Sequence, residues 1–222
     1  MKRIGLLSDT HSFWDPKYLE YFEECDEIWH AGDIGSMEVV QKLSAFRPFR
    51  AVYGNCDGGD IRKMFGEKLR WRCEDAEVLM THIGGYPGKY APGIRTQLYN
   101  RPPHLFICGH SHILKVQFDP KLGLLHINPG AAGIMGWHKV RTLVRFTVEG
   151  QAFKDLEVIE IPRTESSSGI LEQLHPTNGA RFTNKPGAIR IVTPYGIRMC
   201  RKATARSTVP SECARTSLTD KL

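Results

Sequence analysis

Two features are missing from this 222-residue sequence: paired cysteines and a long apolar run. The six cysteines, at 25, 56, 73, 108, 200 and 213, include no Cys-x-x-Cys pair, which argues against a thiolate zinc site or a thioredoxin-like motif. No apolar run approaches the ~20 residues that span a membrane. The apolar run that follows the basic N-terminus has about four residues, against the roughly 7–15 of a secretory signal. We therefore expect a cytoplasmic protein without a membrane partner and without a disulfide framework.

The first 164 residues also lack an excess of positive charge. The whole chain has a net charge of +6, but residues 165–222 hold nine Lys/Arg and four Asp/Glu, which gives +5. The remaining 21 basic and 20 acidic residues leave the body at +1. Because binding to a phosphate backbone usually needs clustered Lys/Arg, this near-neutral body disfavours a nucleic-acid partner.

The composition of the chain changes after Pro162. Up to that point it fits one globular domain, in line with the overall hydrophobic fraction of 41% and charged fraction of 24%. Beyond it lie three consecutive serines and then scattered Pro, Gly, Thr and Arg, with Ile189–Val192 as the one strand-like run. We predict a domain at residues 1–163 and a basic, disordered C-terminal extension at 164–222.

Short apolar runs alternate with helical patterns in the first half of the domain, and strands dominate its second half. Expected strands are Arg3–Ser8, Glu27–His30, Phe49–Tyr53, Ala76–Thr81, Leu105–Cys108, Ile113–Phe118, Gly123–Ile127, Val140–Val148 and Gln151–Ile161. Expected helices are Pro16–Glu24, Ser36–Phe46 with Ser36 as N-cap, and Pro92–Asn100. This order predicts an α/β fold of two packed sheets with helices outside.

Seven polar side chains stand where five of these strands end. They are Asp9, His11, Asp33, Asn55, His82, His110 and His112. Ligands of open α/β sheets bind beyond the carboxyl ends of the strands, so these residues are expected to converge on one site. In the Asp-x-His and His-x-His pairs, alternate side chains of an extended segment would point to the same side.

The residue types indicate a pair of divalent metal ions. Imidazole suits Zn, Fe and Ni, while carboxylate and amide oxygens suit Mn and Mg. Four His, two Asp and one Asn are wrong for a four-ligand structural zinc site but match two ions that share a bridging carboxylate. Each residue alone has another explanation: Asp33 as a helix cap, His82 as a core histidine, the Gly-His-Ser-His segment as a polar turn. The ordered set favours the metal site.

The order Asp-x-His, Gly-Asp, Gly-Asn-x-Asp, His, Gly-His-x-His resembles the calcineurin-like metallophosphoesterases. The short length and Cys56 are similar to the small bacterial and archaeal phosphodiesterase branch, and the resemblance covers about residues 1–162. It implies a four-layer fold, with two sheets packed face to face and helices on both outsides. It also implies two ions, of Mn, Ni, Fe or Zn. One would be held by Asp9, His11, Asp33 and His112, the other by Asp33, Asn55, His82 and His110.

The implied activity is metal-dependent hydrolysis of a phosphate ester, most simply a phosphodiester (a phosphoric diester hydrolase), by a hydroxide that the two ions activate. Asn55 and His82 are also candidates for contact with the small phosphate-ester substrate. Many larger relatives have a histidine acid where this chain has Cys56, and an ordinary thiol is a poor acid for a basic leaving group. His138 or a metal-bound water remains a candidate acid, and Cys56 is expected to stand passively beside the ligands.

Two rival functions remain. The retromer scaffold subunit of eukaryotes has the implied fold with an impaired metal site, and it works through protein contacts. A metal-dependent nuclease would use the same centre on nucleic acid. The complete ligand set argues against the first and the near-neutral body against the second. The sequence leaves a homo-oligomer open.

Overall fold

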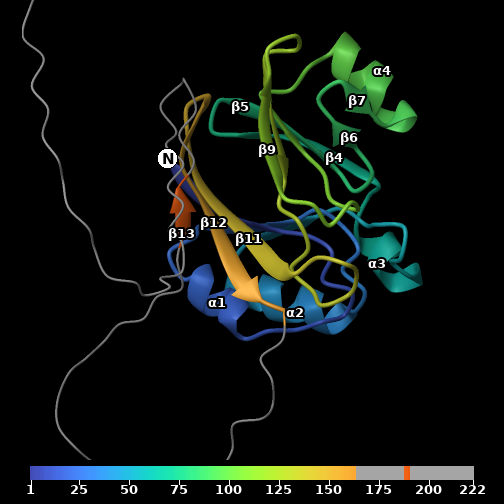
Figure 1. The fold of residues 1–222 in the computed structure, drawn as a ribbon, viewed down its shortest axis with the longest axis vertical. Coiled ribbons are helices and arrows are strands. Elements are labelled where there is room, and N and C mark those ends of the chain that lie inside the picture. The colour runs from blue at the N-terminus through green and yellow to red at the C-terminus, as the bar shows by residue number, and fades with distance from the viewer. Residues whose placement is uncertain (164–187, 191–222) are drawn as a thin grey trace, which may run out of the picture.

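The computed structural model describes residues 1–163 and 188–190. Within this part, two sheets pack face to face, and helices cover their outer faces (Figure 1). The α/β fold with two sheets flanked by helices is thereby confirmed.

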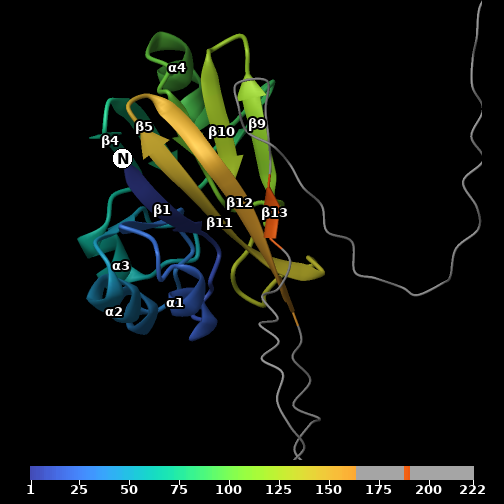
Figure 2. The ribbon, with the colours of Figure 1, turned by 90° about the vertical axis from the view of Figure 1, so that its left-hand side faces the viewer.

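The first sheet has six strands in the described residues, in the order β13-β12-β11-β1-β2-β3. Their bounds are β1 Lys2–Leu7, β2 Glu27–His30, β3 Phe49–Ala51, β11 Val140–Glu149, β12 Ala152–Pro162 and β13 Ala188–Arg190. Strands β1, β2 and β3 run parallel, so their carboxyl ends meet at one edge of the sheet. Figure 2 shows β13 beside β12, as the outermost strand on the side of the sheet away from β3, and Ile189 pairs there with Val158.

The second sheet has five strands in the order β4-β5-β8-β10-β9. Their bounds are β4 Lys68–Cys73, β5 Ala76–Thr81, β8 Leu105–Ile107, β9 Lys115–Asp119 and β10 Leu124–Asn128. Strands β5, β8 and β10 are parallel, and a short hairpin of β6 (Gly85–Tyr86) and β7 (Lys89–Tyr90) follows β5. In both sheets, loops therefore follow the carboxyl ends of parallel central strands.

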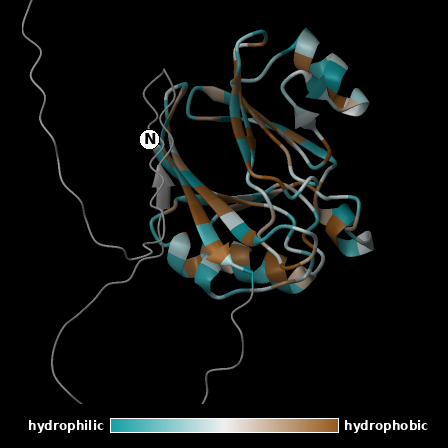
Figure 3. Ribbon diagram, in the orientation of Figure 1, coloured by the Kyte–Doolittle hydropathy of each residue, from teal (hydrophilic) through white to brown (hydrophobic). Residues whose placement is uncertain are grey.

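Apolar and polar residues alternate along several strands (Figure 3), and the buried apolar side chains form three clusters. Ile4 and Leu6 of β1 point between the sheets, where they join side chains of β5, β8 and β11. Leu7 points to the other face, into a cluster with helices α1 (Lys17–Tyr21) and α2 (Met37–Phe46). On the far side, Ile94 and Leu98 of α4 (Pro92–Asn100) cover the second sheet. Burial of these faces, at roughly 25 cal/mol per Å² of apolar area, holds the layers together.

The expected strands and helices all occur, with ends shifted by a few residues. The structure adds helix α3 (Gly59–Met64), strand β4 and the short β6–β7 hairpin, which the sequence did not predict. Ser36 is the N-cap of α2 but makes no side-chain capping hydrogen bond. Its hydroxyl is buried without a hydrogen-bond partner among the described residues, so the expected N-cap position is confirmed but the side chain does not cap the helix.

The expected extension at 164–222 falls, apart from β13, outside the described residues. The strand-like run near Ile189 does form β13. No helix in the described part of the chain is long and apolar enough to cross a bilayer. The described cysteines at 25, 56, 73 and 108 are free thiols, and all of them except Cys56 are buried.

Candidate metal centre

Five loops bring the predicted residues to one edge of the molecule. The loops follow β1, β2 and β3, which are parallel in the first sheet, and β5 and β8, which are parallel in the second, and the ligand groups join loops of both sheets. Six of the seven predicted ligands occur in groups whose donor atoms lie within 4.8 Å of one another. These six are Asp9, His11, Asp33, His82, His110 and His112.

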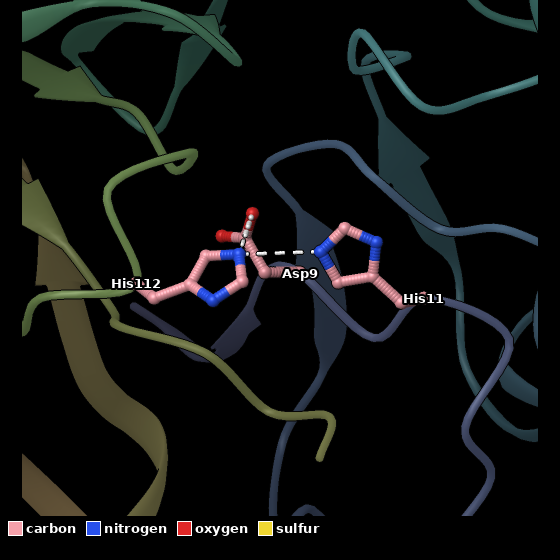
Figure 4. A group of neighbouring side chains, drawn as sticks. All are labelled: Asp9, His11 and His112. Carbon is pink, nitrogen blue, oxygen red and sulfur yellow. Dashed lines mark hydrogen bonds and ion pairs between the residues drawn. The ribbon is translucent and has the colours of Figure 1, made fainter. Parts of the chain in front are cut away.

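The first group joins the β1 loop to the β8 loop (Figure 4). The Nε2 atoms of His11 and His112 are 3.2 Å apart, and His112 Nε2 is 3.2 Å from Oδ1 of Asp9. Asp9 is fully buried, and its carboxylate accepts the backbone N–H of His110 at 3.1 Å. That hydrogen bond fixes one carboxylate relative to the loop that supplies two of the histidines.

The second group consists of Asp33, His82 and His110. His82 Nε2 lies 3.2 Å from Asp33 Oδ2, and the rings of His82 and His110 meet edge to face with centroids 5.2 Å apart. The Nδ1–H of His82 donates to the carbonyl of Ala31 at 2.8 Å. This contact turns the Nε2 lone pair toward the carboxylate.

Asp33 connects the two groups. Its Oδ2 is 3.2 Å from His82 Nε2 and 3.8 Å from His11 Nε2, while its Oδ1 accepts the backbone N–H of Cys56 at 2.8 Å. Burial opposes ionisation of Asp33, but the contact with His82 and the hydrogen bond from the Cys56 N–H outweigh it and hold the pKa of this carboxyl below its usual range. Asp33 is therefore an anion between two sets of imidazoles.

The donor set fits divalent cations. His82 Nε2 is buried without a hydrogen-bond partner, and its lone pair faces an anionic oxygen. Its burial disfavours a protonated ring, but the Asp33 carboxylate prevails and raises the pKa of His82. The pKa of His112 is raised by its hydrogen bond to Asp9, against burial. A cation among these groups would satisfy the same carboxylates without protonating the imidazoles.

The backbone at these residues differs from the expected extended form. Asp9, His11, Asp33, His110 and His112 all have left-handed φ angles, between 47° and 67°. The argument that Asp-x-His and His-x-His lie along extended segments is therefore wrong. Non-glycine residues in this region cost about 1 kcal/mol or more each, and such strain clusters at functional sites.

Residues outside the predicted ligand set hold the loops together. His30 accepts the Gly32 N–H at Nδ1 and donates from Nε2 to Thr10 Oγ1, at 3.2 Å and 3.0 Å. It is fully buried, and burial lowers its pKa to about 4, so the ring is neutral. Asp57 accepts the N–H groups of Gly35 and Gly54, both at 2.7 Å. The position of Asp57 in Gly-Asn-x-Asp was the only signal of this role in the sequence.

Three further candidates are Asn55, Cys56 and His138, and the sulfur of Cys56 also lies within 4.8 Å of donor atoms of His11 and Asp33. The side-chain amide of Asn55 donates to Cys56 Sγ at 3.2 Å, and Asn55 and His82 line a common pocket of about 290 Å³. Partial burial and then the Asp33 carboxylate raise the pKa of the Cys56 thiol, so it stays protonated. His138 donates from Nε2 to the carbonyl of Gly133 at 3.0 Å, which leaves Nδ1 as an acceptor and does not favour an acid role.

The calcineurin-like phosphoesterase superfamily domain matches residues 1–151, about two thirds of the chain. The chain belongs to this superfamily. The calcineurin-like phosphoesterases are metal-dependent hydrolases of phosphate esters, and the grouped residues supply suitable ligands for a metal. A search of curated protein sequences finds no match to the chain.

Solved structures of the calcineurin-like fold are similar to this one throughout the described domain. An archaeal phosphodiesterase matches at 20% identity with a TM-score of 0.58, over 72% of this chain and 99% of its own. A predicted phosphoesterase of Streptococcus pneumoniae matches at 18% identity with a TM-score of 0.54, over 73% of this chain and 90% of its own. Vps29 of Chaetomium thermophilum matches at 14% identity with a TM-score of 0.61, over 74% of this chain and 91% of its own. At these identities the likeness establishes the fold.

Proposed function

We propose that this calcineurin-like protein is a phosphodiesterase that requires two divalent metal ions. The observation that carries the proposal is Asp33, a buried anion whose Oδ2 lies 3.8 Å from His11 of the first group and 3.2 Å from His82 of the second. One group would be completed by Asp9, His11 and His112, and the other by His82, His110 and Asn55. Two bound ions would lower the pKa of a coordinated water and offset the charge of the phosphoryl oxygens.

The residues of the chain contribute orientation. The Ala31 carbonyl fixes the His82 ring, and the His110 N–H fixes the Asp9 carboxylate. The Cys56 N–H holds one oxygen of Asp33, so the other is directed toward His82 and His11. Because these groups are hydrogen-bonded in advance, little reorganisation is needed when a substrate binds.

The environment of Cys56 favours diesters with good leaving groups. A thiol with a raised pKa is a weaker acid than an ordinary thiol, and His138 uses its N–H on Gly133. Neither side chain therefore supplies a strong acid to a basic alkoxide. Aryl diesters, which leave as weakly basic phenolates, need no such acid.

The test is hydrolysis of bis(p-nitrophenyl) phosphate by protein loaded with Mn or Ni. We expect turnover that is lost on chelation and restored by metal, and weaker turnover of the matching monoester. The rival scaffold function rests on the likeness to Vps29, since similar folds include both that protein and a phosphodiesterase. Metal-loaded protein without hydrolysis of any ester would favour the scaffold.

A further inference from the structure

A second pocket, of about 240 Å³, lies on the outer face of the second sheet, next to the loop that holds His110 and His112. Its polar lining comes from Tyr86, Ser111, Lys115, His126 and Asn128. The proposed hydrolysis assigns no role to it.

The strand register gathers these residues. In the antiparallel pair of β9 and β10, Lys115 lies opposite Asn128, and Gln117 lies opposite His126. Because alternate residues of a strand share a face, Lys115, His126 and Asn128 all project from the same side of the sheet. The β6–β7 hairpin adds Tyr86 over that side.

His126 is a buried polar group without a partner. The side chain is fully buried, and neither ring nitrogen has a hydrogen-bond partner among the described residues. Burial, helped by the charge of Lys115, lowers the pKa of His126 to about 4 against the Phe106 backbone and Asp119, so the ring is neutral near pH 7. A buried N–H donor without a hydrogen-bond acceptor destabilises the fold by about 1–3 kcal/mol. An acceptor bound in the pocket would remove this cost.

Lys115 brings a positive charge to the same pocket. Its Nζ lies 4.3 Å above the ring of Tyr86, and no carboxylate among the described residues forms an ion pair with it. The carboxylate of Asp119 is already engaged, since it accepts the hydroxyl of Tyr90 at 2.6 Å and the N–H of Lys121 at 2.9 Å. The ammonium group of Lys115 is thus available to an anion.

Ser111 links this pocket to the candidate metal centre. Its Oγ accepts hydrogen bonds from Asn128 Nδ2 at 3.1 Å and from the Ile113 N–H at 3.3 Å, which leaves the hydroxyl hydrogen to donate. Ser111 also lines the neighbouring cavity with His110 and His112. One residue therefore borders both the proposed ions and the Lys115 pocket.

We propose that the Lys115 pocket is an oxyanion subsite, in which Lys115, His126 and Ser111 bind a second anionic group of the substrate. The group is a phosphate or a carboxylate, because a cation and two neutral donors match several oxygen acceptors. The preferred substrate is then a phosphodiester with a further negative charge beyond the scissile phosphate. Only the link to the substrate rests on the proposed function.

Binding tests the subsite without catalysis. Metal-free protein in chloride buffer is titrated with inorganic phosphate and, separately, with acetate, by calorimetry. Lys115→Gln should weaken binding of the preferred anion about tenfold, the equivalent of one charged hydrogen bond. Lys121→Gln is the matched control, because Lys121 likewise lies over a tyrosine ring (Tyr99, 5.5 Å) but does not line this pocket.

His126→Phe is the second variant, chosen because phenylalanine retains the ring that stacks on Phe106 while removing both nitrogens. This variant should weaken binding of the same anion severalfold. Whichever of phosphate and acetate binds the unaltered protein more tightly identifies the ligand as a phosphate or a carboxylate. Absence of binding to the unaltered protein, or equal binding by Lys115→Gln and Lys121→Gln, overturns the subsite.

Kinetics then test the link to the substrate. With metal-loaded protein, Lys115→Gln should raise KM for a diester with an added carboxylate or phosphate and leave kcat unchanged. KM for bis(p-nitrophenyl) phosphate should not change. An equal KM for both substrates in the unaltered enzyme overturns this link, whereas no turnover of either substrate refutes the proposed function and leaves the binding result standing.

Discussion

Asp33 is the residue that lies between the two ligand groups, in contact with His11 of one and His82 of the other. Replacement by Asn removes the one negative charge placed between two proposed dications, whose repulsion at ~4 Å is large in a partly buried site. We predict that Asp33→Asn loses at least one metal per chain and about a thousandfold or more in kcat, since removal of a single preorganised charge contact already costs on the order of 10²–10³. Metal analysis by mass spectrometry and kinetics on the same sample measure both.

Cys56→Ala is the matched control for Asp33→Asn. The contact of Cys56 with Asp33 that fixes Oδ1 is made by its backbone N–H, which alanine retains. The variant should keep its metal content and lose no more than about threefold in rate, within the effect of one weak side-chain contact. If Cys56→Ala loses metal while Asp33→Asn keeps two ions, the assignment of these residues is inverted.

His126 gives a pH dependence that is separate from the metal site. Its folded pKa of about 4 lies below the ordinary value near 6.5, so the folded state binds fewer protons than the unfolded state between these values. The stability is complete above about pH 6.5 and falls as the pH drops through 4, by up to about 3 kcal/mol. In His126→Phe this loss should be absent. Urea unfolding with chelator at about pH 7 and 4.5 checks the sign, and an equal acid loss in both proteins would refute it.

At the residue scale, the convergence of the candidate ligands was predictable but the residues that support them were not. Asp9, His11, Asp33, His82, His110 and His112 converge as the strand-end argument requires. The left-handed backbone at several of them had no sequence signal, since the pattern of residue types alone does not encode φ. His30 and Thr10 lie outside the motif, and only the pairing of β1 with β2 brings them together.

Among the elements, the loop after β3 approaches the loop after β2 so closely that a side chain at Gly54 has no room. A Cβ at Gly54 would lie 2.0 Å from Asp33 Oδ1 and 2.4 Å from the Asp33 backbone nitrogen. Arg62 of α3 also holds this loop, by donating to the carbonyls of Asp57 at 2.7 Å and of Gly54 at 3.1 Å. The loop after β3 is therefore held both by its close contact with Asp33 and by Arg62.

Gly54→Ala should displace Asp33, with loss of metal and of at least about tenfold in rate, because even a shift of about 1 Å in a positioned group is costly. Gly58→Ala, in the same loop, is the control: a Cβ there meets nothing within 4 Å. Metal content and thermal stability of the two variants decide the matter. Similar metal content in both would mean that the loops part easily and that the close contact is not needed.

The two main elements that the sequence analysis missed share a weak apolar pattern. Helix α3 buries only Ile61, and β4 has one fully buried residue, Cys73, because it lies at the edge of its sheet. A short, mostly exposed element lacks the periodicity that identified α2 and α4. The buried strands β2 and β5, in contrast, have the expected bounds.

For the whole molecule, a chain that ends at Arg163 should fold and keep its metal. All the grouped ligands and the three apolar clusters lie within residues 1–163, and the truncation removes from the described structure only the three pairs between β13 and β12. We predict a change in unfolding free energy of no more than about 1–2 kcal/mol, and unchanged kcat. A truncated protein that aggregates or loses metal would instead assign part of the fold to residues beyond 163.

The central claim is that one shared site holds two divalent ions and uses them to hydrolyse a phosphodiester. The most direct measurement is a metal titration of chelated protein in which bound metal per chain and turnover of bis(p-nitrophenyl) phosphate are followed together. The account predicts no turnover without metal and a rise that is complete at two bound Mn or Ni ions per chain. Full turnover after exhaustive chelation, or two bound ions with no turnover, would contradict it.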